Sequence, residues 1–159
     1  MNAKRRPILA GNWKMNMTAT QARELASKLL PLVSSVKDRD IVLAPPFTSL
    51  AAVAETIKGT NIGLAAQNLH WEDKGAFTGE ISAEMLLDLG CRYVIIGHSE
   101  RRQYFGETDE TVNKKVKQAP KKGLLPILCV GETLAEREAG KLHEIISRQV
   151  TVGLKDIPA

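Results

Sequence analysis

Two short segments carry polar side chains whose types and positions could do chemistry. In GNWKMN (11–16), Lys14 follows an apolar run, where its ammonium could snorkel to the surface or hold a phosphate or oxyanion. In IGHSERR (96–102), Gly97 permits a tight turn, and we expect Ser99 to cap a short helix directly after His98. The positive end of a helix dipole favours a neutral histidine, which could donate a hydrogen bond to a carbonyl oxygen.

Each of these features also has a purely structural interpretation. His98 could be a satisfied structural histidine, and Glu100, Arg101 and Arg102 could be a solvated charge cluster or an interface ion-pair network. Cys129 lacks a basic neighbour in its segment, so we expect it to pack rather than react. No GxGxxG, Walker, HExxH or GxSxG sequence is present, which removes the commonest dinucleotide, nucleotide, zinc-protease and serine-hydrolase hypotheses.

Apolar runs alternate with amphipathic ones along the whole chain, which predicts five βα units. Capping boxes at Thr18 and Thr133 start two helices, and Pro120 should end or kink another. A further helix, capped by Ser82, should bury the stripe Met85, Leu86 and Leu89. Strands are expected at 7–14, 41–44, 62–66, 93–96 and 125–130.

The alternation indicates an α/β fold in one domain, 1–159, with a parallel sheet covered by helices. Ligands of such folds bind at the carboxyl ends of the strands, where Lys14 and His98 are expected. Length and composition favour an open doubly wound sheet, because a (β/α)8 barrel typically needs ~250 residues. The polar loop 67–79 is longer than a usual βα connection, which indicates a functional or interfacial role.

The composition, 43% hydrophobic and 25% charged in 159 residues, is that of a globular protein. The net charge of +4 suits a phosphorylated substrate, but the basic run 4–6 is too short and aromatic-poor for nucleic acid. Two cysteines without ligand spacing indicate reduced thiols. With neither a signal-peptide core nor ~20 consecutive apolar residues, we expect a cytoplasmic protein that does not bind membranes.

Four motifs together resemble the triosephosphate isomerase family: GNWKMN (11–16), AAQNLHWEDKGAFTGEIS (65–82), IIGHSERR (95–102) and CVGE (129–132). They occur in the order and approximate spacing that this family shows, and the similarity begins at about Pro7. The resemblance overrides the doubly wound sheet and implies a (β/α)8 TIM barrel, of which the chain supplies roughly the first five βα units.

The resemblance implies interconversion of dihydroxyacetone phosphate and D-glyceraldehyde 3-phosphate through an enediolate, in glycolysis and gluconeogenesis, without metal or cofactor. Asn12 and Lys14 would contact the substrate, His98 would be the neutral electrophile, and Glu100 would be a supporting catalytic carboxylate near Lys14. A neutral histidine electrophile is the established role in this family, so its agreement with the dipole argument is not an independent result.

The loop 67–79 resembles the family's dimer loop, which implies a homodimer. Thr78 would reach into the neighbouring subunit beside its Asn12 and Lys14, and Phe77, Gly79 and Arg101 are expected at the same interface. Two aromatic residues in this polar loop, Phe77 and Trp71, support an interface, because exposed aromatic side chains are costly unless they are covered.

The family's general base and phosphate loops follow the fifth strand, beyond Ala159, and neither Glu132 nor Glu136 matches the position of the base. We therefore expect the 159 residues alone to be inactive and to need a complementing C-terminal segment. The alternative is a non-catalytic half-barrel fragment or assembly module. A flavodoxin-like binding domain survives only if the motif match is accidental.

Overall fold

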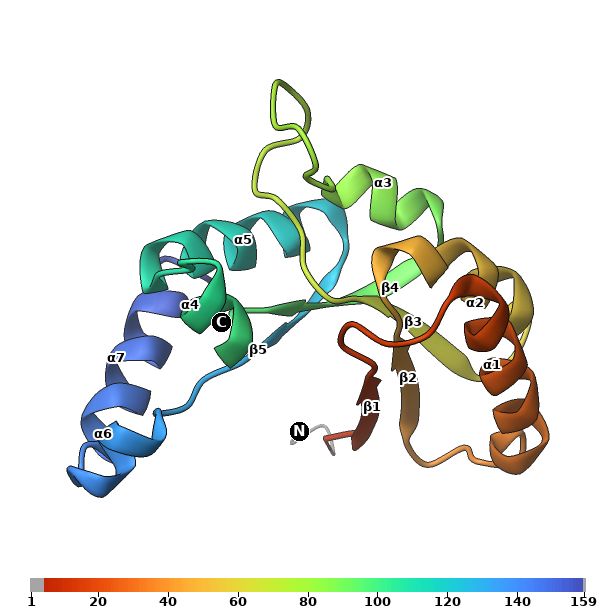
Figure 1. Cartoon of the computed structure of the whole chain (residues 1–159), viewed down its shortest axis with the longest axis horizontal. Coiled ribbons are helices and arrows are strands. Elements are labelled where there is room, and N and C mark those ends of the chain that lie inside the picture. Colours follow the sequence, from red (N-terminus) through yellow and green to blue (C-terminus); the bar gives the residue numbers. More distant parts are fainter. Residues whose placement is uncertain (1–4, 159) are drawn as a thin grey trace. The chain divides into compact units, whose positions relative to one another are not determined.

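The computed structural model describes residues 5–158, so Lys4 of the basic run lies outside it. Strands and helices alternate as expected (Figure 1). The strands are β1 (Ile8–Asn12), β2 (Asp40–Ala44), β3 (Ile62–Ala66), β4 (Cys91–Ile96) and β5 (Leu125–Leu128). The helices are α1 (Ala19–Val33), η1 (Phe47–Ser49), α2 (Leu50–Ile57), α3 (Ala83–Asp88), α4 (Ser99–Tyr104), α5 (Asp109–Lys122), α6 (Leu134–Glu138) and α7 (Leu142–Gly153).

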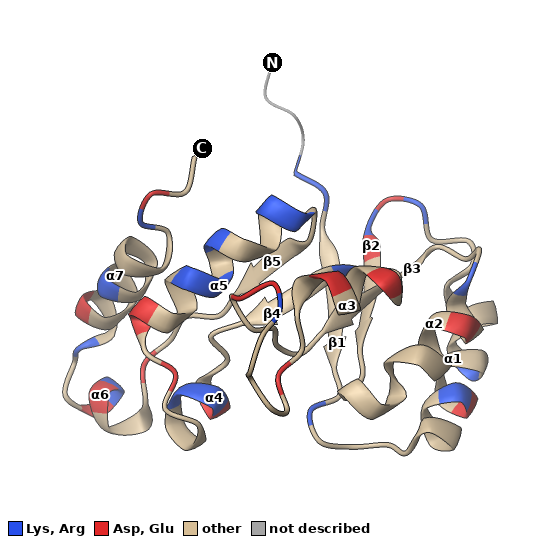
Figure 2. Ribbon diagram, turned by 90° about the horizontal axis from the view of Figure 1, so that it is seen from above, with Lys and Arg blue, Asp and Glu red and all other residues tan. Residues whose placement is uncertain are grey.

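The described residues form two compact units. The first unit holds 5–67 and 84–94, and the second holds 68–83 and 95–158, so that β4 passes from one to the other after Val94. The expectation of a single domain stays a prediction. Charged residues lie mainly on helices and loops in both units, while the strands are mostly uncharged (Figure 2).

The first unit is built on parallel pairs of β1 with β2, β2 with β3, and β3 with the first residues of β4. β2 and β3 are apolar and mostly buried, as expected of covered parallel strands, whereas β1 is more exposed. Helix α1 packs against α2, and its Ala22 and Ala26 are fully buried. Gly63 makes room for a neighbouring ring, since a Cβ there would lie 3.1 Å from Cε2 of Tyr93. The hydroxyl of Tyr93 then donates to Asp40 at 3.0 Å, which links the starts of β2 and β4.

The second unit is organised by α5, which buries Val112, Val116 and Ala119. The helix packs on β5 and α7, and Asn113 donates to the backbone carbonyl oxygens of Gly153 and Lys155. Cys129 N donates to Ile96 O at 2.9 Å, so the chain after β5 follows the end of β4. The strand order in the described residues is β1-β2-β3-β4-β5.

Helix ends confirm some expectations and correct others. The capping boxes of Thr18 and Thr133 are formed, and a third at Thr108 was not predicted. Pro120 does not itself end its helix: α5 continues for two residues to Lys122 and is stopped by Gly123 in the left-handed conformation. The stripe predicted for α3 is also wrong at Met85, which is exposed, whereas Leu86 is buried.

Candidate active site

In the first unit, the end of β1 places Asn12 and Lys14. Trp13 N donates to Ala44 O at 3.1 Å, which extends the pairing of β1 with β2 by one residue. The backbone then turns, and Lys14 adopts a φ of +53° while its N–H donates to the side-chain oxygen of Asn12 at 3.0 Å. A left-handed conformation costs an ordinary residue roughly 1–2 kcal/mol, so Lys14 is held in an unusual backbone geometry.

In the second unit, the end of β4 places His98 and Glu100. Gly97, at φ +73°, turns the chain, and α4 begins directly after His98, as expected. The cap, however, is not Ser99: Nδ1 of His98 accepts from the backbone N–H of Glu100 at 3.2 Å. The expectation of a Ser99 cap is therefore wrong, because the imidazole nitrogen does what a serine oxygen would otherwise do.

This cap determines where His98 can carry its proton. A ring nitrogen that accepts from a backbone N–H carries no proton, so a neutral His98 has its proton on Nε2. Glu100 Oε2 also lies 3.5 Å from Nδ1, but that distance is an ion pair only if the ring is charged, and the capping bond argues against it. His98 thus presents Nε2–H as a donor.

The turn before His98 is fixed by Arg102, which the sequence offered only as part of a charge cluster. Its Nε donates to Gly97 O at 3.0 Å, and its Nη1 donates to Asp109 at 2.5 Å. A Cβ on Gly97 would lie 3.0 Å from Val112 and 3.2 Å from Arg102 Nη2, so only glycine fits this turn. Arg148 of α7 also donates to Asp109, at 3.0 Å.

A buried ionic cluster joins α4 to α5. Arg101 Nε donates to Glu107 Oε1 at 2.6 Å, Lys115 donates to the same oxygen, and Lys115 also donates to Asn68 at 2.7 Å. Burial is the largest influence on Glu107 and would raise its pKa, but the hydrogen bonds and charges of Lys115 and Arg101 outweigh it, so the pKa lies below its usual value. Burial lowers the pKa of Lys115.

This cluster was not predicted from the sequence, although the sequence contains one signal for it. Lys115 lies three residues after Val112 and four before Ala119, which places it on the apolar stripe of α5. Its side chain is 4% exposed and that of Glu107 is 6% exposed. A lysine on a buried stripe calls for a carboxylate partner, but the sequence alone does not say which one.

The loop from Asn68 to Ile81 is fastened within the second unit. His70 stacks on Trp71 at 4.2 Å and contacts Phe77 at 4.4 Å between ring centroids, and His70 N donates to Ile81 O at 2.8 Å. Lys114 lies over the ring of Trp71, and Lys122 and Gln118 hold Asp73. Trp71 is thus partly covered inside the chain.

The remaining predicted interface residues lie in this same unit. Phe77, Thr78 and Gly79 are exposed, with Gly79 at φ +89°, whereas Arg101 is partly buried against Glu107. The structure therefore joins Asn12 with Lys14, and His98 with Glu100. The two pairs belong to different compact units, and their roles stay predictions.

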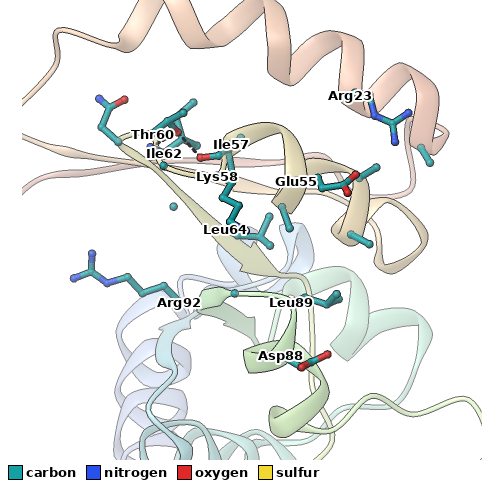
Figure 3. A pocket seen from close by; sticks show the side chains of 18 of the residues that line it. Arg23, Glu55, Ile57, Lys58, Thr60, Ile62, Leu64, Asp88, Leu89 and Arg92 are labelled. Atoms are coloured by element: carbon teal, nitrogen blue, oxygen red, sulfur yellow. Dashed lines mark hydrogen bonds between the residues drawn. The ribbon is translucent and has the colours of Figure 1, made fainter.

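The first unit also has a groove away from Asn12 and Lys14. An open groove of about 1040 Å³ is lined by α2, α3 and the strands β3 and β4, with Lys58, Leu64, Asp88 and Arg92 around it (Figure 3). Neither Asn12 nor Lys14 lines it, and its residues from Lys58 to Ile62 lie before or at the start of β3. Ligands of parallel α/β folds bind at the carboxyl ends of the strands, so a substrate is expected there and not in this groove.

The cysteines are weak candidates for chemistry. Burial raises the pKa of Cys91 to about 12 and also raises that of Cys129, so both favour the thiol. Within residues 5–158, no three His, Cys, Asp or Glu side chains gather as a metal site would require. None of the described helices is both long and apolar enough to cross a bilayer.

A parallel α/β fold with polar residues at the ends of β1 and β4 is typical of enzymes with (β/α)8 barrel or doubly wound folds. Comparison with known proteins distinguishes between these two classes. The family model described as triosephosphate isomerase matches residues 7–159. The chain is 61% identical over 153 residues to a triosephosphate isomerase of Moorella thermoacetica, and 56% identical over 153 residues to one of Thermoanaerobacter pseudethanolicus. Each alignment covers 96% of this chain. The chain belongs to the triosephosphate isomerase family.

A solved structure agrees with the sequence comparisons. The crystal structure of triosephosphate isomerase from Bartonella henselae matches with a TM-score of 0.89 and 41% identity, over 96% of this chain and 63% of that one. The fold is thus that of the first five βα units of a TIM barrel, as predicted. The chain spans 61% of the length of either curated relative.

Proposed function

We propose that these residues are part of an isomerase that interconverts dihydroxyacetone phosphate and D-glyceraldehyde 3-phosphate through an enediolate. The observation that carries the proposal is the cap of α4: Nδ1 of His98 accepts a backbone N–H, which leaves Nε2–H to polarise a substrate carbonyl. A neutral imidazole suits this step, because its Nε2–H can stabilise the developing enediolate oxygen by a hydrogen bond.

The other site residues receive roles by the same chemistry. Lys14 supplies a positive charge for the phosphate and the enediolate, and Asn12, which already fixes the backbone of Lys14, contacts the substrate. Glu100 is a supporting carboxylate beside His98. The assignment of these groups to one substrate rests on the family to which the chain belongs.

Proton abstraction from carbon needs a positioned carboxylate, and neither Glu132 nor Glu136 is suited to this role. The pKa of Glu132 is lowered by a hydrogen bond from its own backbone N–H and by Arg137. The pKa of Glu136 is lowered by hydrogen bonds from the backbone and the side chain of Thr133. Both carboxylates are engaged and weakly basic, so we propose that the base comes from a segment equivalent to the remaining two fifths of the relatives.

We further propose a cytoplasmic homodimer that uses neither metal nor cofactor and works in glycolysis and gluconeogenesis. The exposed Phe77, Thr78 and Gly79 of a loop that is fastened at its base support insertion into a partner. We treat the 159 residues as part of one domain of that subunit. The competing function, a non-catalytic assembly module, is favoured by the exposed Ile8 and Leu9 of β1.

Complementation tests the proposal. The chain is co-expressed with the C-terminal two fifths of the Moorella relative, and turnover of glyceraldehyde 3-phosphate is measured in a coupled assay. We expect activity, and a loss of about 10²- to 10³-fold in kcat/KM for Lys14→Met and for His98→Gln. Lys28→Met and His143→Gln, at exposed helix positions, are matched controls and should change little. A verified stoichiometric complex without turnover, or full activity in Lys14→Met, would contradict the proposal.

A further inference from the structure

Gln67, the residue that follows β3, joins three strand ends through one side chain. Its Nε2 donates to the backbone oxygen of Lys14 at 2.9 Å and to that of Ala44 at 2.8 Å. Ala44 ends β2, and Lys14 lies two residues after β1. A glutamine amide has two N–H groups, so both donors of Gln67 are used in holding these carbonyls.

The backbone that Gln67 holds is the unusual one described above. At Lys14, φ is +53°, and such a conformation persists only where the surroundings determine it. The peptide before the Cα of Lys14 is fixed on both sides: its N–H donates to Asn12, and the carbonyl of Trp13 accepts from Asn16 at 2.8 Å. The peptide after that Cα is held by Gln67. The two peptides together set the direction of the Cα–Cβ bond of Lys14.

We propose that Gln67 is a positioning residue that fixes the direction of the Lys14 side chain through the backbone carbonyl of Lys14. The assignment of a substrate to Lys14 rests on the isomerase function proposed above, but the hold of Gln67 on the backbone does not. Gln67 thereby couples the end of β3 to the ammonium at the end of β1 through backbone hydrogen bonds.

The chain contains a matched control for this proposal. Nδ2 of Asn61 also donates to two backbone carbonyls of the first unit, those of Val33 and Val36, at 2.8 and 2.9 Å. Replacing either amide by an acid of the same shape removes two such bonds. Only the change at Gln67 faces Lys14, so a general loss of stability and a specific effect on Lys14 are separable.

The first test is NMR spectroscopy of the isotopically labelled 159-residue chain. A left-handed φ brings the amide proton and Hα of a residue close together, which gives a strong intraresidue NOE. We expect that NOE at Lys14 in the wild type, its loss in Gln67→Glu and Gln67→Met, and its retention in Asn61→Asp. Met17, at φ +76° in the same loop, should keep its own strong NOE in every variant.

A second readout needs no substitution. The two Nε2 protons of Gln67 should exchange with solvent more slowly than those of the exposed Gln103. Equal exchange, or a folded Gln67→Met chain that keeps the Lys14 NOE, would overturn the proposal.

Kinetics of the complemented enzyme give the functional consequence. We expect Gln67→Met to lower kcat/KM about 10²-fold, as misplacement of a binding group by about 1 Å can do, and Asn61→Asp to leave it nearly unchanged. An inactive wild-type complex would count against the isomerase function and leave the NMR result on Gln67 standing. An active complex in which both variants fall equally would contradict positioning through Lys14.

Discussion

Glu107 carries a buried charge on which the second unit depends. Its carboxylate accepts from Arg101 and Lys115, and its pKa is below the ordinary 4.5. A depressed folded-state pKa means that ionised Glu107 contributes stability above pH 4.5, and that this contribution is lost as the pH falls through the folded-state pKa. We expect Glu107→Gln to lower the free energy of unfolding by about 3 kcal/mol at neutral pH, because it leaves Lys115 buried without a carboxylate.

Urea unfolding between neutral pH and about pH 3 measures both effects. The wild type should lose more stability than Glu107→Gln as the pH falls below 4.5. Glu138→Gln, at an exposed position in α6, should follow the wild type at every pH. Parallel curves for the wild type and Glu107→Gln would show that Glu107 is not the group responsible.

Asp109 is the second residue whose loss should be costly. Its side chain is 10% exposed and accepts from both Arg102 and Arg148, so Asp109→Asn leaves two guanidinium groups without a carboxylate. We expect a loss of about 3 kcal/mol in thermal or urea unfolding. The control is Asp156→Asn, which removes the ion pair of Asp156 with Lys117. The Asp156 side chain is 68% exposed, so this substitution should cost less than about 1 kcal/mol. Equal losses would mean that burial does not distinguish the two pairs.

At the scale of elements, α5 depends on its first turn. Thr108 accepts from Thr111 N at 3.3 Å, and Thr111 Oγ1 accepts from Thr108 N at 2.9 Å, which satisfies two backbone donors. Thr108→Ala should therefore destabilise the chain by about 1 kcal/mol in urea unfolding. Thr151→Ala makes the same chemical change at an exposed position in the last turn of α7, where alanine is the better helix former, and should be neutral or slightly stabilising. A loss at Thr151 as large as at Thr108 would argue against capping.

The elements also show what sequence can and cannot predict. The five strands and most helices were predictable, because apolar periodicity and capping residues act locally, as at Thr18 and Thr133. The cap by His98 and the two hydrogen bonds of Gln67 were not predictable, since each depends on atoms that only the folded backbone brings together. Pro120 does not mark the last residue of α5, which ends two residues later before Gly123.

At the scale of the whole molecule, we expect the share of its relatives' length that the chain spans to determine whether it self-associates. The chain matches its relatives over 96% of itself but only 61% of them. In the described residues β1 pairs only with β2, and its Ile8 and Leu9 are about half exposed. An edge strand with exposed apolar side chains is a template for association.

We therefore expect the 159 residues alone to self-associate, with a weight-average mass in sedimentation that rises with concentration. Ile8→Lys should reduce this association, because a charge on an edge strand opposes pairing. Leu32→Lys is the matched control, since Leu32 is 75% exposed but lies on α1 rather than on a strand. A chain that is monomeric at all concentrations, or that Leu32→Lys rescues equally, would mean that the edge of β1 does not drive association. Association suppressed by the relative's C-terminal segment would instead indicate that this edge is where the rest of a barrel pairs.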